Sequence, residues 1–449
     1  MSRLFGTDGV RGVANSQLTP ELAYKLGKAG ATVLGRQKHG SPLIIIGKDT
    51  RISGDMLENA LAAGVMSAGG NVIKAGVIPT PAIAFLVGRY NADAGAVISA
   101  SHNPFEYNGI KFFNSRGFKL SDEIENEIEA YISGDAKENF AESQKIGTVS
   151  CKETESGELY INHLVDTADS DFKDFTIVMD CANGASYMTA PEVYRRLGAN
   201  LTVIADSPDG ININDGCGST HPETLQKTVV ETGADIGLAY DGDADRLIVV
   251  DEKGRVVDGD KVICICAAML KSKGTLKNNL VTCTVMSNLG FHKHLEAMGC
   301  KSIATGVGDR YVLESMLETG SVIGGEQSGH IIFLDYATTG DGTLASIQLI
   351  NAIRHFGMKI SELADDIVMY PQVLVNAKVK NENKSIYMDD QQIADAIRSL
   401  EDKMAGEGRV LIRPSGTEPL VRVMIEGTDK EQIKQDAHEL AQLIESKFA

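Results

Sequence analysis

Short apolar runs alternate along the chain with segments whose apolar residues recur at helical spacing. The first group of runs predicts buried strands at 43–46, 71–74 and 94–99. The segments between these runs predict helices at 55–68 and 82–88. Strands that alternate with helices in this way are typical of an α/β fold.

The same order of elements returns twice further along the chain. Its second occurrence predicts strands and helices at 176–180, 190–197, 201–205, 223–232 and 235–239. Its third occurrence predicts them at 280–284, 290–298, 302–304, 311–318 and 321–324. We therefore expect three diverged α/β units of similar order.

The C-terminal part has a different pattern, in which half-exposed strands accompany amphipathic helices. The predicted elements there are 372–380, 391–404, 409–413, 421–426 and 429–448. This pattern predicts a separate and smaller α+β domain. We expect domains at 1–150, 156–253, 257–366 and 371–449, with linkers near 148–158, 251–258 and 366–370.

The composition is that of a globular protein, because 43% of the 449 residues are hydrophobic and 23% are charged. The longest apolar run, 262–270, is much shorter than the ~20 residues of a membrane span and predicts a buried helix. The first residues lack the pattern of a signal peptide. The seven scattered cysteines favour reduced thiols, so we expect a cytoplasmic protein.

The formal net charge of −18 narrows the choice of partners. An acidic surface repels nucleic acid and anionic membranes, so we expect neither as a partner. A small anionic substrate is still compatible with this charge, because a basic pocket can lie within an acidic molecule.

A polar loop follows the last strand of each α/β unit. The three loops are Ser-Ala-Ser-His-Asn-Pro at 99–104, Asp-Gly-Asp-Ala-Asp-Arg at 241–246 and Gly-Glu-Gln-Ser-Gly-His at 325–330. Ligands of open α/β sheets bind beyond the carboxyl ends of the strands. We therefore expect the three loops to converge on one cleft.

The second loop predicts a metal site, because Asp241, Asp243 and Asp245 would repel one another without a cation. An EF-hand calcium loop and a solvated acidic loop are the alternatives. The EF-hand needs glycine where Arg246 stands, and its flanks should be helices rather than strands. A magnesium site beside a phosphate fits better, because Arg246 adds a cation to the same loop.

Ser101 is the candidate nucleophile of the first loop. The flanking residues lack the glycines of the G-x-S-x-G motif, which excludes an α/β-hydrolase elbow. A serine can instead carry a phosphoryl group where a metal neutralises the phosphate. A turn serine without chemistry is the alternative.

Two further segments have a composition that suits a phosphosugar. The segment 413–422 combines a glycine turn with hydroxyls and arginines, which together can cradle a phosphate. Its candidate ligands are Arg413, Ser415, Gly416, Thr417 and Arg422. A hairpin whose charges are solvated is the alternative. The loop at 325–330 offers Glu326, Ser328 and His330 to sugar hydroxyls or an amine. The glycine-rich segment 6–12 lacks the end of a P-loop.

These motifs, in this order, resemble those of the α-D-phosphohexomutase family over nearly the whole chain. The Glu-Gln-Ser-Gly-His form of the loop at 325–330 and the start Gly-Thr-Asp-Gly-Val-Arg-Gly at 6–12 look most like the branch that acts on glucosamine phosphates. The resemblance implies three similar mixed α/β domains plus a smaller C-terminal α+β domain around a central cleft. It also implies that glucosamine 6-phosphate and glucosamine 1-phosphate are interconverted on the route to UDP-N-acetylglucosamine and peptidoglycan.

The resemblance further implies a phosphoserine at Ser101 and one Mg²⁺ per chain, held by that group with Asp241, Asp243 and Asp245. Glucosamine 1,6-bisphosphate is the implied intermediate, and Arg246, Glu326, Ser328 and His330 are the implied sugar ligands. The candidate general bases are Arg11, His102, Lys111 and His330. A homodimer is compatible with the sequence.

Three other functions stay open at this stage. The first is a phosphoglucomutase or phosphomannomutase, which would prefer other hexose phosphates. The second is a phosphatase or kinase in which Asp241 is the nucleophile. The third is a metal-binding protein without catalysis.

Overall fold

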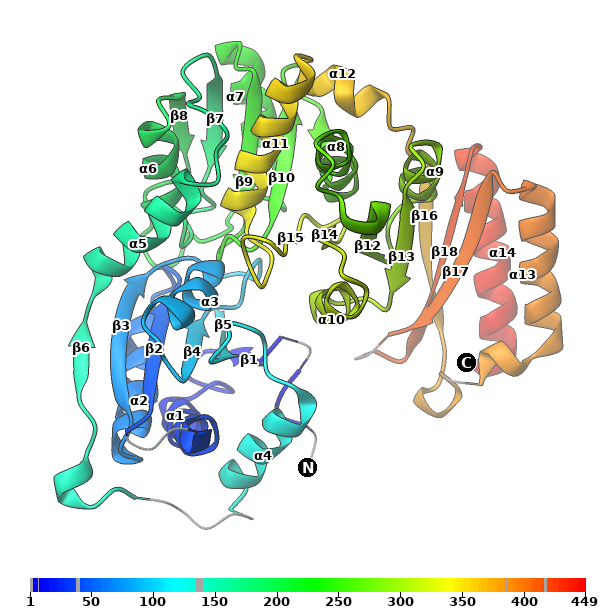
Figure 1. The fold of residues 1–449 in the computed structure, drawn as a ribbon. Coiled ribbons are helices and arrows are strands. Elements are labelled where there is room, and N and C mark those ends of the chain that lie inside the picture. Colours follow the sequence, from blue (N-terminus) through cyan, green and yellow to red (C-terminus); the bar gives the residue numbers. More distant parts are fainter. Residues whose placement is uncertain (1–2, 7, 38–40, 135–139, 385, 416–417) are drawn as a thin grey trace. The chain divides into compact units, whose positions relative to one another are not determined.

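The computed structural model describes residues 3–6, 8–37, 41–134, 140–384, 386–415 and 418–449 (Figure 1). The chain forms two compact units. The larger unit contains Met1–Met286 and Cys300–Asp366, and the smaller unit contains Ser287–Gly299 and Ile367–Ala449.

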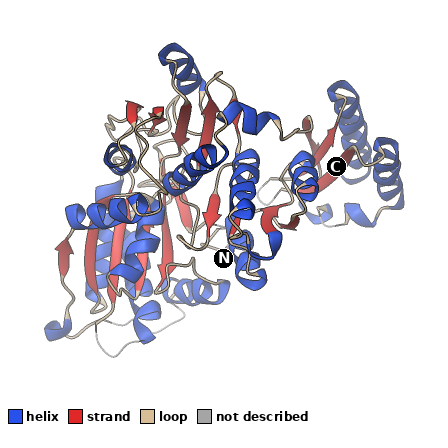
Figure 2. Ribbon diagram, turned by 45° about the horizontal axis from the view of Figure 1, so that its top comes forward, coloured by secondary structure: helices blue, strands red, loops and turns tan. Residues whose placement is uncertain are grey.

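The first part of the larger unit is a six-stranded mixed sheet of order β1-β5-β4-β2-β3-β6. Its strands are β1 (Val10–Val13), β2 (Leu43–Lys48), β3 (Asn71–Val77), β4 (Ala94–Ile98), β5 (Tyr107–Asn114) and β6 (Val149–Cys151). Its helices are α1 (Pro20–Leu34), α2 (Gly54–Ser67), α3 (Thr80–Arg89), α4 (Asp122–Ile132) and α5 (Glu153–Val165). Helices lie in front of and behind this sheet in Figure 2.

The alternation of side chains along β2 explains why this sheet is covered on both faces. Ile44 and Ile46 pack into one core cluster together with residues of α1, α2 and α4. Ile45, which is also fully buried, points to the other face. A strand that is apolar on both faces is stable only between two layers of helices.

The next two sheets repeat the central part of the first. The second sheet has the order β11-β10-β9-β7-β8 and the third has the order β13-β12-β14-β15. The second sheet is built from β7 (Thr176–Asp180), α6 (Thr189–Arg196), β8 (Asn200–Ile204), α7 (Glu223–Thr232), β9 (Ile236–Tyr240), β10 (Leu247–Asp251) and β11 (Val256–Val257). The third region is built from α8 (Gly259–Ser272), β12 (Leu280–Thr284), α9 (Leu289–Ala297), β13 (Lys301–Thr305), α10 (Asp309–Thr319), β14 (Ile323–Gly325), β15 (Ile331–Phe333), α11 (Gly342–Phe356) and α12 (Ile360–Asp365).

A common four-strand order relates the three sheets. The orders β5-β4-β2-β3, β10-β9-β7-β8 and β15-β14-β12-β13 correspond strand for strand. In each case the last parallel strand is followed by an antiparallel partner, which makes a hairpin of β4–β5, β9–β10 and β14–β15. The predicted threefold repeat is therefore confirmed.

The smaller unit is an antiparallel sheet of order β16-β18-β17 with two long helices. Its elements are β16 (Gln372–Lys378), α13 (Gln391–Met404), β17 (Gly408–Pro414), β18 (Leu420–Gly427) and α14 (Lys430–Phe448). Apolar residues of the strands and of both helices form one core, which includes Val423, Ile393 and Leu440. The predicted α+β domain is present, and the segment that carries α9 belongs to the same unit.

The segment near 148–158, which we expected to be a linker, carries regular secondary structure. It contains β6, which pairs in parallel with β3, and the first residues of α5. Short 3₁₀ turns complete the chain at Gly35–Gln37, Ser143–Lys145, Lys277–Asn279, Asn381–Asn383 and Tyr387–Asp389.

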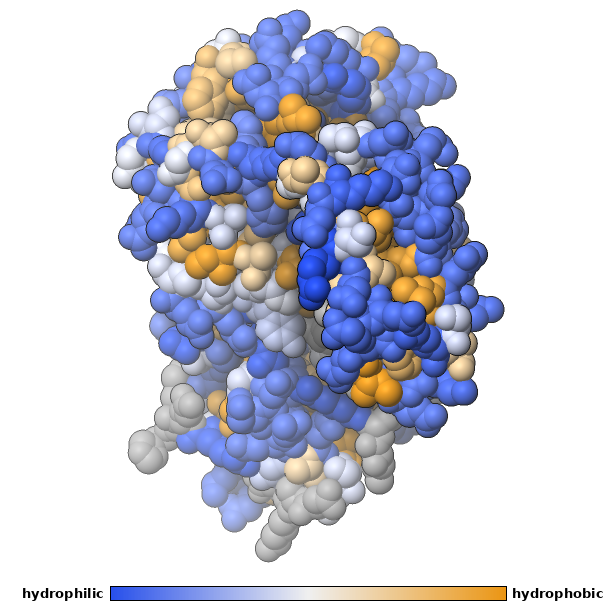
Figure 3. Space-filling model, turned by 90° about the vertical axis from the view of Figure 1, so that its right-hand side faces the viewer, coloured by the Kyte–Doolittle hydropathy of each residue, from blue (hydrophilic) through white to orange (hydrophobic). Residues whose placement is uncertain are grey.

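The surface of one face of the molecule is largely polar. The face drawn in Figure 3 is mostly hydrophilic, with hydrophobic areas scattered among polar ones. No helix in the described part of the chain combines the length and the apolar character that a membrane crossing requires.

Candidate active site

The three polar loops are the connections of the three β-hairpins. Ser101 follows β4, Asp241 follows β9 and Glu326 follows β14. Because the three hairpins belong to equivalent positions of the three sheets, the chain places a different polar loop at the same point of each repeat.

Ser101 is buried, with 2% of its surface exposed, and adopts a left-handed backbone conformation with φ of 54°. Its hydroxyl donates a hydrogen bond of 2.5 Å to Oδ2 of Asp241, and its N–H donates to Oγ of Ser99 at 2.9 Å. Gly242 allows the two loops to come this close, because a Cβ there would lie 2.6 Å from the carbonyl oxygen of Ser101. The structure thus joins the serine directly to the aspartate loop.

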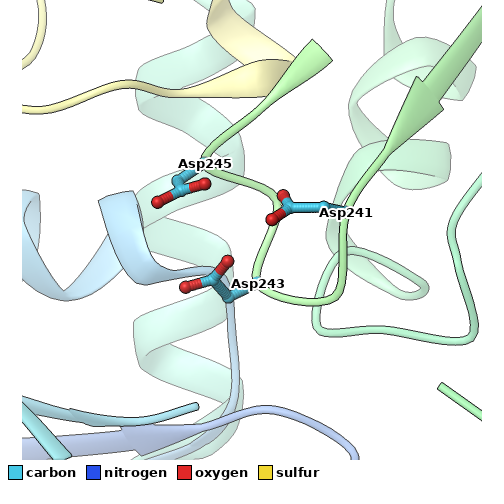
Figure 4. Close-up of side chains that lie close together, drawn as sticks. All are labelled: Asp241, Asp243 and Asp245. Atoms are coloured by element: carbon cyan, nitrogen blue, oxygen red, sulfur yellow. The ribbon is translucent and has the colours of Figure 1, made fainter. Parts of the chain in front are cut away.

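Asp241, Asp243 and Asp245 are all buried, and their carboxylates can bring one oxygen each within 4.8 Å of one another. Figure 4 shows the three side chains turned toward a common space. One oxygen of Asp243 accepts hydrogen bonds from Thr80 and Lys111, at 2.6 and 2.9 Å. Oδ1 of Asp243 and Oδ1 of Asp245 are buried without a hydrogen-bond partner among the described residues. Unsatisfied carboxylate oxygens that face one another fit a divalent cation with hard oxygen ligands.

The pKa shifts of two of the three aspartates also favour a bound cation. Burial, together with the neighbouring Asp245 and Asp243, raises the pKa of Asp241 well above its usual value. Burial also acts against ionisation of Asp245, but His330 and Lys111 outweigh it and lower the pKa of that carboxyl. A cation in the middle would relieve the repulsion that raises the pKa of Asp241.

Cationic side chains surround the triad on the side of the first sheet. Lys111 of β5 is 2% exposed and lies 2.9 Å from carboxylate oxygens of both Asp8 and Asp243. Burial disfavours its charge, yet Asp243 and Asp8 raise the pKa of Lys111. Arg11 of β1 pairs with Asp8 as well. Lys111 and Arg11 therefore share the carboxylate of Asp8.

His330 is buried beside the triad. Its Nε2 accepts a hydrogen bond of 3.0 Å from the N–H of Gly340, and its Nδ1 lies 3.5 Å from Oδ2 of Asp245. Burial would lower the pKa of His330, but Asp245 and Asp309 raise it above the ordinary value. Gly340 must be glycine here, because a Cβ would lie 2.6 Å from the imidazole ring.

The remaining predicted residues of the larger unit lie in the same loops. The backbone N–H of Arg246 donates to Asp241 at 3.2 Å, and Arg246 forms a β-bridge with His330. Glu326 accepts a hydrogen bond of 3.3 Å from the N–H of Gly308, and Ser328 is exposed. His102 lies with Nδ1 3.4 Å from Oγ of Ser101.

The residues that we predict to form a phosphate cradle belong to the smaller unit. Arg413 of β17 and Arg422 of β18 are directly opposite each other in the antiparallel register. Burial and the charge of Arg422 both lower the pKa of Arg413. Like charges in opposite positions destabilise a sheet unless an anion lies between them. Oγ of Ser415 accepts from the N–H of Glu418 at 3.2 Å. Gly416 and Thr417 lie outside the described residues.

Four residues at this site were missed in the sequence. Thr80 and Asp8 contact the residues already named, and Lys119 forms ion pairs with Asp8 and with Asp309. Asp8 lies within the glycine-rich segment 6–12, which was a usable signal. Lys119, a single lysine in a loop, and Thr80, at the start of a helix, stand in no sequence pattern that would mark them as part of the site.

Comparison with known families identifies the class of protein. The chain matches the four domain models described as phosphoglucomutase/phosphomannomutase: alpha/beta/alpha domain I over 2–139, domain II over 158–254, domain III over 258–370 and the C-terminal domain over 374–443. It therefore belongs to the phosphoglucomutase/phosphomannomutase family, and the resemblance inferred from the sequence is confirmed.

Two curated relatives of similar length carry the name phosphoglucosamine mutase. The phosphoglucosamine mutase of Alkaliphilus oremlandii is 56% identical over 449 residues, and that of Thermoanaerobacter pseudethanolicus is 58% identical over 451 residues. Each match covers 100% of both proteins.

Solved structures share the fold. A phosphoglucomutase/phosphomannomutase family protein from Burkholderia thailandensis aligns with a TM-score of 0.82 at 23% identity, over 100% of this chain and 99% of that one. The N-acetylphosphoglucosamine mutase of Aspergillus fumigatus, in complex with GlcNAc-6P and magnesium, aligns with a TM-score of 0.73 at 16% identity, over 99% and 96%.

Proposed function

We propose that this protein interconverts glucosamine 6-phosphate and glucosamine 1-phosphate through a phosphoserine at position 101. The observation that carries the proposal is the buried Ser101 hydroxyl in contact with the aspartate loop. The full-length relatives with the name phosphoglucosamine mutase support this choice of substrate over glucose or mannose phosphates.

In the proposed first step, the phosphoryl group leaves Oγ of Ser101 and bonds to the free hydroxyl oxygen of the bound sugar phosphate. The proton of that hydroxyl passes to a base, and the product is glucosamine 1,6-bisphosphate. In the second step the other phosphoryl group of the bisphosphate returns to Ser101. The sugar oxygen that is released in the second step takes back the proton that the base received in the first, and the serine regains a phosphoryl group, so atoms and charge balance over the two steps.

The residues present fit a magnesium ion, since Asp241, Asp243 and Asp245 supply oxygen ligands and two of their oxygens lack partners among the described residues. Magnesium bound there would offset negative charge on the phosphoryl oxygens. Lys111 and Arg246 add fixed positive charge to the same loops, which stabilises charge that develops during transfer.

His102 is the preferred partner for proton exchange with the serine. It lies 3.4 Å from the serine oxygen, whereas Lys111 and Arg11 are engaged by Asp8. His330 is engaged by the N–H of Gly340 at one nitrogen and faces Asp245 with the other. Glu326 and Ser328 of the same loop would bind sugar hydroxyls or the amine.

Arg413, Ser415 and Arg422 are proposed to hold the phosphate that does not react. The opposed arginines form a site with excess positive charge, and guanidinium groups bind phosphate with paired N–H donors. The same cradle would accept the 6-phosphate in one direction of the reaction and the 1-phosphate in the other.

The test combines mass spectrometry with an activity assay. The purified protein should carry one phosphate, which peptide mapping places on Ser101, and should turn over glucosamine phosphates faster than glucose or mannose phosphates. A labile phosphate on Asp241 would instead support a phosphatase or kinase. Absence of turnover with every hexose phosphate would refute the mutase proposal.

A further inference from the structure

A buried guanidinium lies directly behind the Ser101 loop. Arg51 follows β2, and its side chain is 0% exposed, as is that of Asp49, whose carboxylate lies 2.9 Å from Nε of Arg51. The charge of Arg51 is thus matched inside the protein. The planar guanidinium can therefore donate several N–H hydrogen bonds in fixed directions.

Within the described part of the chain, the other hydrogen bonds of this guanidinium all go to the serine loop. Nη2 donates to the carbonyl oxygens of Ser101 and Asn103, at 2.9 and 2.8 Å. Nη1 donates to the carbonyl oxygen of Pro104 at 3.0 Å. One planar group therefore fixes three carbonyls within four residues of chain.

The second repeat supplies another donor to the same carbonyls. Asn214 lies in the segment between β8 and α7, and its Nδ2 donates to the oxygens of Ser101 and Asn103, at 2.9 and 3.1 Å. Asn214 is 7% exposed and is itself left-handed, with φ of 58°. Two carbonyls of the serine loop thus receive two donors each, one from each repeat.

This arrangement explains how Ser101 keeps a conformation that serines rarely adopt. A left-handed non-glycine residue persists only where its surroundings impose it. If the loop relaxed, the hydroxyl would leave its position beside Asp241.

We propose that Arg51, held by Asp49, and Asn214 are positioning residues that clamp the Ser101 loop for phosphoryl transfer. They touch neither the sugar nor the transferred group. Their loss should therefore reduce kcat and leave the KM for the sugar phosphate unchanged. The proposal rests on the function proposed above for Ser101.

Arg51→Lys keeps the charge opposite Asp49 but cannot span three carbonyls with a planar fork. Asn214→Asp keeps the size and tolerates the left-handed backbone, but it presents oxygens to the two carbonyls. We expect each change to lower kcat by about 10- to 100-fold, as a small misplacement of a reacting group does. Thermal melts show whether each variant is folded, and Asn214→Asp decides the question if Arg51→Lys fails to fold.

Two matched controls lie outside the clamp. Arg354 also bonds a carbonyl, that of Asp171, and a carboxylate, that of Asp174. Asn59 donates to the carbonyl of Asp55 at 2.7 Å. Arg354→Lys and Asn59→Asp should keep the kcat of the unchanged protein.

The double variant provides a second readout. Because Arg51 and Asn214 act on the same two carbonyls, their effects on kcat should be less than additive. Independent damage to two parts of the fold would be additive, and this result would overturn the proposal. Unchanged kcat in both single variants, or a raised KM with unchanged kcat, would overturn it as well. Failure of the proposed function would appear differently, as an unchanged protein that turns over no hexose phosphate.

Discussion

At the scale of single residues, the sequence predicted those whose role follows from their local pattern. The three aspartates of the loop 241–246 are so close in sequence that they predict a metal site without knowledge of the tertiary structure. The structure places them beside Ser101. Thr80 could not be predicted, because it reaches Asp243 across 163 positions of the chain. Contacts of that separation depend on packing between repeats, which a local pattern does not encode.

Ser101→Ala should abolish mutase turnover, because no other group is proposed to carry the phosphoryl group. The protein should lose the mass of one phosphate and keep its melting temperature, since only a buried hydroxyl is removed. Turnover and intact mass are measured together, with Ser115→Ala as the control at an exposed serine. Substantial activity of pure Ser101→Ala protein would refute the phosphoserine mechanism.

Asp243→Asn should weaken magnesium binding and activity together. The change removes one negative charge from the proposed ion and leaves Lys111 paired with Asp8. Magnesium titrations followed by calorimetry and by turnover should both shift to higher concentration. Calcium should support activity poorly in the unchanged protein, because its longer and looser coordination misplaces phosphoryl oxygens. If the magnesium dependence of Asp243→Asn equals that of the unchanged protein, the metal binds elsewhere.

At the scale of elements, strong hydrophobic patterns were the reliable signal. The strand Thr176–Asp180 and the helix Glu223–Thr232 lie where the sequence predicted them. The strand β6 was missed, because all three of its residues are exposed and the strand shows no apolar alternation. An edge strand is defined by its pairing with β3, and pairing partners are not visible in a local pattern.

Arg413→Ala should raise the KM for the sugar phosphate with little loss of stability. Removing Arg413 also removes the repulsion with Arg422 across β17 and β18, which offsets the lost packing. A charged hydrogen bond is worth about 1.5–3 kcal/mol, so we expect a rise in KM of about 10- to 100-fold. Steady-state kinetics and a thermal melt measure the two effects. The exposed Arg398 of α13 provides the control, and a KM equal to that of Arg398→Ala would refute the cradle.

At the scale of the whole molecule, the division into units departs from the order of the chain. The sequence predicted a helix at 290–298 in the third repeat, and α9 is present at that position. The segment that contains α9, Ser287–Gly299, nevertheless packs as part of the C-terminal unit. The buried Glu426 of β18 explains this. It accepts from the N–H of Leu289 at 3.0 Å and from Arg409 at 2.6 Å, and Arg409 donates to the carbonyl of Ser287 at 2.5 Å.

Glu426→Ala should destabilise the C-terminal unit by about 3 kcal/mol, because it leaves Arg409 without its buried partner and frees the start of α9. The double change Glu426→Leu with Arg409→Met should restore much of this loss. Urea unfolding of the full chain measures the effect. Glu407→Ala serves as the control, since Glu407 pairs with Lys293 at an exposed position. Equal stability of Glu426→Ala and Glu407→Ala would show that this ion pair does not anchor α9.

The hairpin that recurs in the three sheets has a consequence for how such a chain can change over time. The strands that hold each loop are shared by all three repeats, whereas the loops carry different side chains. If the chain arose by triplication of one ancestral module, each copy could specialise in a different task. One loop would carry the phosphoryl group, another would bind the metal, and the third would select the sugar. New substrate preferences could then arise by substitutions in the last of these loops while the inherited chemistry of the other two was preserved.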